Sequence, residues 1–352
     1  MQNFTFQNPT KIIFGEGQIA ALGERAWFVF SGIEPNPTYE TLMQAVALAR
    51  EKNINFLLAV GGGSMIDGTK FIAAAMNFDG EPWDILAKQA PVRDAVPFGS
   101  VLTLPATGSE MNNGSVISYR AKGDKLFFTS DVTYPLFSVL DPTTTYSLPP
   151  RQIANGVVDA FVHIVEQYLT YPVDAKVQDG FAEGLLITLT EVGPQALAEP
   201  HNYSVRANLM WTATLALNGL IGAGVPQDWA THMLGHEITA LHGLDHAQTL
   251  AIVLPAMLTV RREQKRAKLL QYAERVWNIT EGSEDERITA AITATRVFFE
   301  RMTVGTRLRD YQIGGGSIDT LIAKLTEHGM IALGEHGEVT PEVSRKVYQV
   351  AV

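Results

Sequence analysis

The stretch Asn55-Phe-Leu-Leu-Ala-Val60 is a short apolar run that passes directly into Gly61-Gly62-Gly63-Ser64-Met65-Ile66-Asp67. A run of this kind, followed by glycines and a helical pattern, predicts a buried strand, a tight turn and the start of a helix. The glycines allow backbone N–H groups to approach a ligand closely, and the N-terminus of the helix favours negative charge. The turn is not a Gly-x-Gly-x-x-Gly fingerprint and would be weak evidence alone. We interpret it as a candidate phosphate site.

The chain contains a second stretch of similar sequence, Gly314-Gly-Gly-Ser-Ile-Asp319. No apolar strand precedes this copy. We therefore expect a loop with a helix N-cap there and no phosphate site.

Short apolar runs alternate with helical patterns over the first 150 residues. Besides 55–60, the strand candidates are 11–14, 98–104 and 136–140. A helix is expected after Glu34-Pro35-Asn36-Pro37, with Asn36 as N-cap and Pro37 at the first helical position. Strands separated by helices predict a mainly parallel sheet. The expected fold of residues 1–149 is therefore a Rossmann-like α/β domain.

The pattern changes after Pro149-Pro150. Helical periodicity fills most of the remaining chain, and strand candidates nearly vanish. The expected helices cover about 151–170, 176–198, 203–222, 226–242, 264–278, 284–302 and 317–328. We expect an all-α domain over 150–352.

Composition excludes several classes of protein. The chain has 352 residues, a formal net charge of −10 and no cysteine. An acidic surface repels nucleic acids and anionic lipids, so we expect neither as a partner. No long apolar window and no secretory signal is seen, so a soluble cytoplasmic protein is expected.

The absence of cysteine also limits the redox chemistry. Any metal site must use nitrogen and oxygen ligands, which excludes a Cys₂His catalytic zinc. Aldehyde oxidation through a cysteine nucleophile is excluded as well. None of the ten tyrosines is followed four residues later by a lysine, which excludes the Tyr-x-x-x-Lys pair of short-chain dehydrogenases.

Two predicted helices carry a cluster of candidate metal ligands. Asp159 and His163 are four residues apart, which places them on one helical face. His232 and His236 have the same spacing, and His246 follows beyond an expected helix break. A polar pair near a helix end is usually structural. A cluster of histidines together with an Asp/His pair is better explained by a metal site.

Three imidazoles and one carboxylate suit Fe²⁺ or Zn²⁺ with one position left for a substrate oxygen. The predicted ligands are Asp159, His163, His232 and His246. His236 would line the site as a proton relay or a nicotinamide contact. His242 is a weaker candidate, and the remaining histidines, His201, His328 and His336, are expected at the surface.

The sequence Thr103-Leu-Pro-Ala-Thr107-Gly-Ser-Glu110 follows the strand candidate 98–104. Hydroxyls and free N–H groups at the carboxyl end of a strand are where an open α/β sheet binds its ligand. An ordinary polar turn is the alternative interpretation.

Together, the motifs at 61–67, 103–110, 159–163 and 232–246 resemble those of the iron-containing (group III) alcohol dehydrogenases. Within that family the chain is most similar to the bacterial NADPH-dependent aldehyde reductases of the butanol-dehydrogenase-like branch. The resemblance covers nearly the whole chain. It implies an N-terminal dinucleotide-binding domain, a helical metal-binding domain and an active site in the cleft between them.

The resemblance also implies a set of cofactor contacts. Gly62, Gly63, Ser64 and Asp67 would meet the pyrophosphate and the nicotinamide ribose. Thr103, Thr107, Asn112 and Lys125 would line the rest of the groove. Family members bind iron or zinc, and the most similar branch favours zinc.

One segment departs from the family pattern. The family places a strand, a glycine-rich turn and a helix, a unit of roughly thirty residues, ahead of the equivalent of Ile33 to Pro37. Here Gly23 to Ala26 runs straight into Trp27. Either the unit is naturally deleted or the sequence omits it. We favour omission, which predicts that Ala26 and Trp27 are not joined by a peptide bond and that their Cα atoms are not about 3.8 Å apart.

The ligand set predicts the chemistry. We expect the metal to act as a Lewis acid on an aldehyde oxygen, and the nicotinamide to deliver hydride to the carbonyl carbon. The resemblance implies that the cofactor is NADP rather than NAD. Two alternatives stay open. One is a lyase similar to dehydroquinate synthase, and the other is a non-catalytic metal-containing oligomer. The apolar alternation of Phe4 and Phe6 suggests a homodimer.

Overall fold

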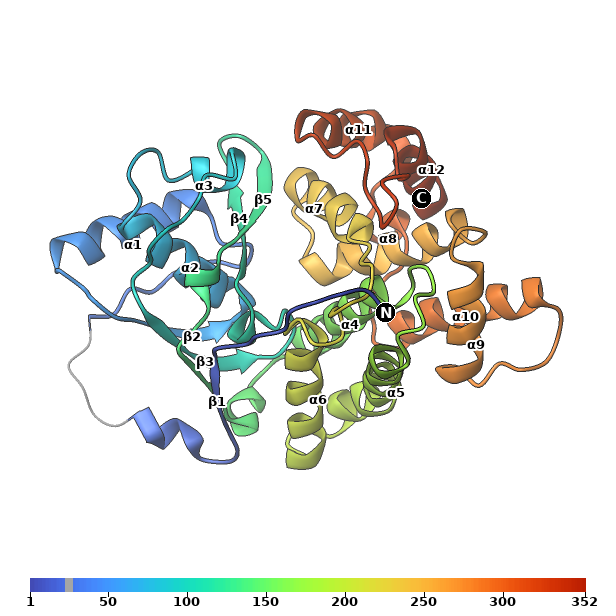
Figure 1. Ribbon diagram of the computed structural model, residues 1–352, viewed down its shortest axis with the longest axis horizontal. Helices are drawn as coiled ribbons and strands as arrows, with labels where there is room; N and C mark the ends of the chain where they lie inside the picture. The colour runs from blue at the N-terminus through green and yellow to red at the C-terminus, as the bar shows by residue number, and fades with distance from the viewer. Residues whose placement is uncertain (23–27) are drawn as a thin grey trace. The chain divides into compact units, whose positions relative to one another are not determined.

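The computed structural model describes residues 1–22 and 28–352, which form two compact units (Figure 1). The first, here called the α/β unit, comprises Gln7–Pro149 and Glu199–Asn218. The second, the helical unit, comprises Met1–Phe6, Pro150–Ala198 and Gly219–Val352. The two units divide at Pro149/Pro150, where the sequence pattern changes. Our prediction about the Ala26–Trp27 junction lies outside the described residues.

A four-stranded parallel sheet forms the centre of the α/β unit, with strand order β1-β6-β3-β2. Each predicted strand lies within two residues of an observed one at either end. The strands are β1 (Lys11–Phe14), β2 (Leu57–Gly62), β3 (Phe98–Leu104) and β6 (Phe137–Leu140). Central strand β3 is covered on both faces, since Val101 and Leu102 are both buried. The Rossmann-like prediction for this half of the chain is confirmed.

The helices of the α/β unit are α1 (Tyr39–Glu51), α2 (Gly63–Met76), α3 (Asp84–Ala87) and α6 (Tyr203–Ala216). The N-cap of α1 is Thr38, whose hydroxyl accepts a hydrogen bond from the Thr41 amide. Our assignment of Asn36 as N-cap was wrong, because Asn36 has a positive φ of 53° in the turn before the helix. Helix α6 was expected in the C-terminal domain, yet it groups with the α/β unit.

An antiparallel hairpin, which we did not predict, completes the α/β unit. It consists of β4 (Gly114–Tyr119) and β5 (Asp124–Thr129). Gly123, with φ of 67°, closes its turn. Its strands mix polar and apolar residues (Gly-Ser-Val-Ile-Ser-Tyr and Asp-Lys-Leu-Phe-Phe-Thr), so neither contains an apolar run as long as that of β2.

The helical unit contains eight helices among the described residues. They are α4 (Pro150–Tyr168), α5 (Lys176–Ala198), α7 (Ala230–His242), α8 (His246–Val260), α9 (Arg266–Arg275), α10 (Glu284–Arg301), α11 (Ile318–Glu327) and α12 (Pro341–Ala351). Two of them, α8 and α12, were not predicted. This half of the chain is nonetheless helical as expected, with only an isolated β-bridge between Leu333 and Val339 within the described part.

Helices α4 and α8 form the buried centre of the helical unit. Helix α8 packs against α4, α7, α10 and α12, and α4 also packs against α5. From Ile153 onward every residue of α4 is buried, including its polar residues. Titratable side chains of α4, among them Asp159, His163 and Glu166, therefore lie inside the core. Among the described residues, no helix is long and apolar enough to cross a membrane.

Candidate metal centre and cofactor-binding turn

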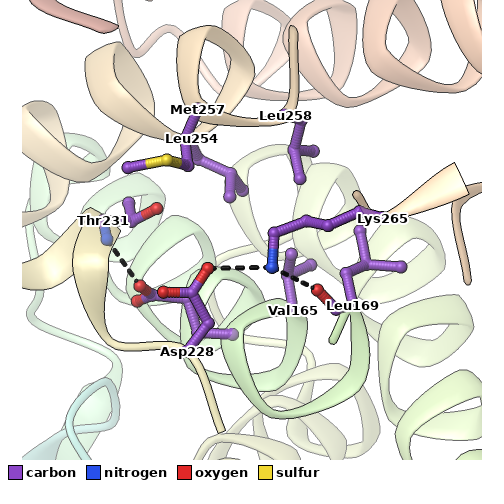
Figure 2. Close-up of a pocket in the computed structure, with 9 residues that line it drawn as sticks. Val165, Leu169, Asp228, Thr231, Leu254, Met257, Leu258 and Lys265 are labelled. Atoms are coloured by element: carbon purple, nitrogen blue, oxygen red, sulfur yellow. Dashed lines mark hydrogen bonds and ion pairs between the residues drawn. The ribbon is translucent and has the colours of Figure 1, made fainter. Parts of the chain in front are cut away.

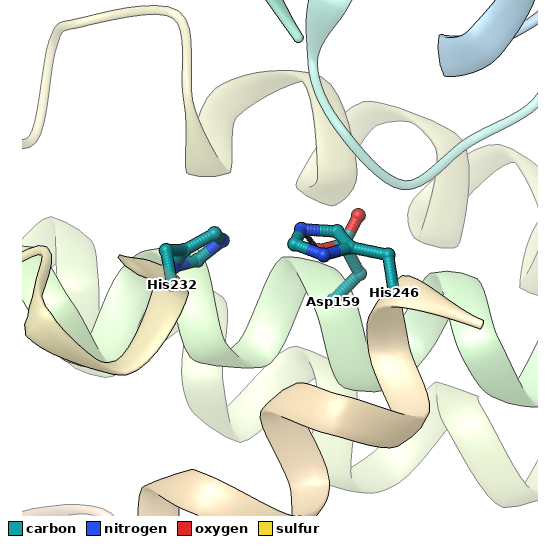
Figure 3. A group of neighbouring side chains, drawn as sticks. All are labelled: Asp159, His232 and His246. Carbon is teal, nitrogen blue, oxygen red and sulfur yellow. Dashed lines mark ion pairs between the residues drawn. The ribbon is translucent and has the colours of Figure 1, made fainter. Parts of the chain in front are cut away.

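Three of the four predicted ligands converge in the helical unit. One ligand atom each from Asp159, His232 and His246 lies within 4.8 Å of the others. Figure 3 shows these three side chains. The three side chains come from α4, α7 and α8, so segments almost ninety residues apart in sequence meet at one point. Ligands bonded to Zn²⁺ at about 2.1 Å in a tetrahedron lie about 3.4 Å apart, so a small inward movement would satisfy an ion.

The turn between α7 and α8 brings His246 back to the site. Gly243 ends α7 with a left-handed φ of 72°, a conformation that favours glycine. Asp245 then forms a capping box with Gln248, and His246 becomes the first residue of α8. The Asp245 carboxylate also accepts hydrogen bonds from Arg151 (Nε, 2.8 Å) and Asn155 (2.8 Å) of α4. These bonds hold the start of α8 against the helix that carries Asp159.

His163 lies beside the group of three. Its ring stacks on that of His232, with ring centroids 4.6 Å apart. Its Nδ1 is 3.7 Å from Asp159 Oδ1, the same distance that separates this oxygen from His246 Nε2. Burial, reinforced by the neighbouring His232, lowers the pKa of His163 well below its ordinary value. His163 is therefore a neutral imidazole, the form in which histidine binds metals.

A residue that we did not predict orients His232. Glu166, on α4, accepts a hydrogen bond from Nδ1 of the His232 ring and from the Thr231 amide (2.7 Å). Because Nδ1 is bonded to Glu166, Nε2 is the ring nitrogen of His232 that is left to bind a metal. A carboxylate bonded to the second nitrogen of a histidine ligand is the usual support of such ligands. The sequence could have indicated Glu166, because Asp159, His163 and Glu166 follow the i, i+4, i+7 spacing of one helical face.

Some imidazole nitrogens at this site are buried and have no hydrogen-bond partner within the described part of the chain, and they indicate whether a cation fits there. His163 Nδ1 and His232 Nε2 are both buried and have no hydrogen-bond partner among the described residues. Orphaned polar atoms of this kind are rare in folded proteins and call for an explanation. Two such nitrogens beside a buried carboxylate are explained by a bound divalent cation.

The other five histidines lie in different surroundings. His236 is buried near the site, with its ring centroid 5.2 Å from that of His246 and 6.3 Å from that of His232. His242 points to Ser317 instead, at 3.0 Å. Two of the three expected surface histidines, His201 and His336, are exposed. The expectation was wrong for His328, whose side chain is buried against Glu237 (2.7 Å).

In the α/β unit, the two predicted cofactor motifs meet at the carboxyl ends of neighbouring strands. Gly62 at the end of β2 pairs in register with Leu104 at the end of β3. A Cβ atom added at Gly62 would lie 2.9 Å from Leu104 Cβ, and one at Gly63 would lie 2.4 Å from Thr107 Oγ1. The glycines are therefore required for the close approach of the 103–110 turn. Because Gly62 is the N-cap and has no side chain, no side-chain oxygen caps the first amides of α2.

A buried polar network holds these two motifs together. The Lys70 ammonium, on α2, donates to Ser109 Oγ, Asn112 Oδ1 and the Gly114 carbonyl, each at 2.8 Å. The Asp67 carboxylate accepts from Ser109 Oγ and from the Val116 amide (2.9 Å). Asp67 and Asn112 thus have protein partners, which gives both a structural role beside the expected cofactor role.

The remaining predicted cofactor residues are distributed around the same edge. Ser64 lies in the first turn of α2, and Thr103 and Thr107 lie at and after the end of β3, all three partly exposed. Lys125, on β5, is buried and donates to Asn36 Oδ1 at 2.9 Å. The similar stretch at 314–319 forms a short 3₁₀ turn leading into α11, with no strand before it and no side-chain cap by Ser317.

Comparisons with known proteins agree with this architecture. The sequence model of iron-containing alcohol dehydrogenase matches residues 23–142, and that of the C-terminal part of the Fe-containing alcohol dehydrogenase family matches residues 153–343. The NADPH-dependent aldehyde reductase YqhD of Escherichia coli is 60% identical over all of both chains. The probable NADH-dependent butanol dehydrogenase 1 of Bacillus subtilis is 38% identical, over 94% of this chain and 95% of the relative.

Solved structures show the same fold. A crystal structure of E. coli YqhD superposes with a TM-score of 0.98 at 59% identity, over 100% of this chain and 99% of that chain. The NADH-dependent butanol dehydrogenase A of Thermotoga maritima superposes with a TM-score of 0.94 at 30% identity, over 100% and 99%.

The alignment with the E. coli reductase is 386 positions long, 34 more than the 352 residues of this chain. The relative therefore has residues without a counterpart here. Full-length matches in sequence and in structure, together with both family models, lead to one conclusion: the chain belongs to the iron-containing alcohol dehydrogenase family.

Proposed function

We propose that this protein is a metal-dependent oxidoreductase that transfers hydride between NADP(H) and a short-chain aldehyde or primary alcohol. The observation that carries the proposal is the convergence of Asp159, His232 and His246, with His163 beside them, in a buried part of the helical unit. The relatives named as aldehyde reductase and butanol dehydrogenase support the reaction class.

The proposed metal ligands are Asp159, His163, His232 and His246, and the proposed metal is zinc or iron. A divalent cation held there supplies Lewis acidity to a carbonyl oxygen. The chain itself keeps the His163 imidazole neutral through burial and orients His232 through Glu166. A fixed ligand set needs no rearrangement when charge develops on the substrate.

The proposed cofactor site is the edge of the sheet where α2 begins. The free amides in the first turn of α2 suit a pyrophosphate. Gly62, Gly63, Ser64, Asp67, Thr103, Thr107, Asn112 and Lys125 are the proposed contacts. NADP is favoured over NAD because the relative at 60% identity is named NADPH-dependent, whereas those named NADH-dependent are 38% identical or less.

His236 is the proposed proton relay or nicotinamide contact. It lies one turn from His232 on α7 and near His246, so it borders the ligand set without belonging to the group of three. A histidine can exchange protons near neutral pH, which suits transfer between an alkoxide and solvent.

The two alternatives are not favoured. A lyase acting on an anionic sugar acid would require several cations around the metal. The residues of α4 beside the ligands are apolar and buried, among them Val158 and Val162. Such walls favour a small neutral aldehyde. A non-catalytic metal-containing oligomer would retain the metal and fail to bind nicotinamide nucleotides.

The decisive experiment compares His232→Ala with the wild type in metal analysis and in NADPH-coupled reduction of an aldehyde series. We expect the variant to lose bound metal and activity together. Retained metal with full turnover would refute the ligand assignment. The same assay with NADH in place of NADPH tests the cofactor preference, and iron against zinc reconstitution identifies the metal.

A homodimer and a cytoplasmic location are further parts of the proposal. Phe4 and Phe6 are partly exposed large apolar side chains, as a subunit contact would require. Light scattering coupled to size exclusion tests the dimer, which Phe4→Ser with Phe6→Ser should weaken.

A further inference from the structure

Behind the metal ligands lies a second buried group of charges that the proposed reaction does not use. Lys265, in the turn between α8 and α9, is 2% exposed, and Asp228, two residues before α7, is 3% exposed. The side chain of Glu335 is 7% exposed. Burying a charged side chain costs folding free energy unless an opposite charge pairs with it. The pairing of these three charges therefore has a structural role.

The Lys265 ammonium contacts three separate segments of the helical unit. It donates to the carbonyl of Leu169, just past the end of α4, at 2.7 Å. It pairs with Asp228 Oδ2 at 2.9 Å and with Glu335 Oε1 at 2.7 Å. Three donors on one ammonium thus meet three acceptors, and Figure 2 shows Lys265 between Leu169 and Asp228.

Asp228 connects Lys265 to α7, the helix that carries His232. Its Oδ1 accepts from the Ala230 amide at 2.8 Å, at the first residue of α7. Its own amide donates to the Glu166 carbonyl at 2.8 Å. Glu166 in turn binds the His232 ring. The start of α7 and the second half of α4 are therefore joined by consecutive hydrogen bonds from Lys265 to His232.

The Lys265 contacts surround a small gap in the packing of α4, α7 and α8. A cavity of about 10 Å³, room for about one water molecule, lies among Glu166, Leu169, Asp228, Met257 and Lys265. These three helices carry the four proposed ligands. Beside the packing of apolar side chains, the directional contacts of these paired charges therefore help to set the separation of the helices.

We propose that Lys265 is a positioning residue for the metal centre: its ammonium holds α4 and α7 at the separation that keeps the ligand set ready for a divalent cation. The proposal rests on the metal site of the proposed function. Mutation of a direct hydrogen-bond partner of a metal ligand typically changes metal affinity 10- to 100-fold, and Lys265 acts through such a partner, Glu166.

The test uses metal-loaded Lys265→Met, with Lys268→Met as the matched control. Lys268 is as deeply buried (4% exposed) and is paired with Asp179 at 2.6 Å, and it lies over the Tyr168 ring at the end of α4. Its hydrogen bond and ion pair among the described residues go to Asp179 on α5 and not to α7. Both variants lose a buried ion pair, so both should be less stable than the wild type.

Metal transfer to a fluorescent chelator is measured for each protein, together with the visible spectrum of the Co²⁺-substituted form. We expect Lys265→Met to release metal at least ten-fold more readily and to show an altered Co²⁺ spectrum. Metal release from Lys268→Met should stay within about two-fold of that from the wild type, because within the described residues Lys268 shares no hydrogen-bond or ion-pair partner with Lys265. Wild-type affinity and spectrum in Lys265→Met, or equal weakening in Lys268→Met, would overturn the proposal.

Asp228→Asn provides a second variant if Lys265→Met does not fold. It keeps an oxygen for the Ala230 amide and leaves Lys265 paired with Glu335, while removing the ion pair to α7. We expect the same direction of change, and unchanged metal affinity would refute the role of Lys265. A wild-type protein that binds no divalent metal would instead refute the proposed function itself.

Discussion

The carboxylate of Glu166 accepts a hydrogen bond from Nδ1 of His232, and both side chains are buried. This contact decides which imidazole nitrogen can bind a metal, because a ring with Nδ1 protonated presents Nε2 as its lone pair. It also explains why Glu166, a charged residue, lies inside the core of the helical unit. Burial raises its pKa and the His232 ring opposes that rise.

We predict that Glu166→Gln weakens metal binding about 10-fold, because a neutral amide holds the ring less strongly and permits the other tautomer. The measurement is competition with a chelator at fixed pH. Glu183→Gln is the control, since Glu183 is buried on α5 and binds Tyr168 (2.8 Å) without contacting a proposed ligand. Equal metal affinity in the wild type and Glu166→Gln would contradict the orienting role.

Removing the metal should destabilise the helical unit selectively. A ligand that binds only the native state stabilises it by about 2.7 kcal/mol at a hundred times its Kd. We therefore expect a chelator to lower the melting temperature and to increase amide hydrogen exchange in α4, α7 and α8. Exchange in the strands of the α/β unit should change little. A uniform increase across both units would indicate that the metal does not act through these helices.

Particular residues show how far the sequence alone could go. The Val60–Gly63 junction was predictable because an apolar run followed by glycines has few other solutions, and β3 was placed at its observed bounds for a similar reason. Asp159 and His232 were found because helical spacing and residue type are both visible in one dimension. His163 was predicted as a ligand by the same spacing, and the structure places it beside the group of three.

Other features could not be predicted because tertiary contacts determine them. Helix α8 is buried on nearly every side and contains Pro255, so it lacks the periodicity that identifies an amphipathic helix. Helix α6 groups with the α/β unit through contacts such as Thr214 with Glu110 (2.6 Å), which join residues 104 positions apart. The Lys265 network likewise involves three segments with no common sequence pattern.

We predict that Gly63→Ala weakens NADPH binding more than 10-fold while leaving the metal content unchanged. The new methyl group would lie 2.4 Å from Thr107 Oγ1 and 2.6 Å from Thr107 Cγ2, so the 103–110 turn must move away from α2. Fluorescence titration of NADPH measures the effect. Gly316→Ala is the control, because it alters the similar glycine stretch at a position with open space around it. A Gly63→Ala protein with unchanged NADPH affinity would show that this turn does not contact the cofactor.

His236→Asn should separate catalysis from metal binding. We expect full metal content, because His236 lies outside the group of three, and a kcat lowered 10- to 100-fold through loss of proton exchange. Loss of metal comparable to that of His232→Ala would instead make His236 a ligand.

The buried ammonium of Lys70 makes stability depend on pH. Burial lowers its pKa to about 8 from 10.5, although Asp67 and Glu110 oppose the change. Between these values the unfolded chain binds more protons than the folded one, so the free energy of unfolding rises with pH from about 8 to about 10.5, by up to ~3 kcal/mol from this group. Above that range the contribution of Lys70 no longer changes.

The measurement is urea unfolding of the wild type and of Lys70→Met at pH 7.5 and 9.5. We expect the stability advantage of the wild type to grow at the higher pH, since the variant lacks this ionisation. An advantage that stays constant or shrinks between the two pH values would mean that Lys70 keeps an ordinary pKa inside the fold.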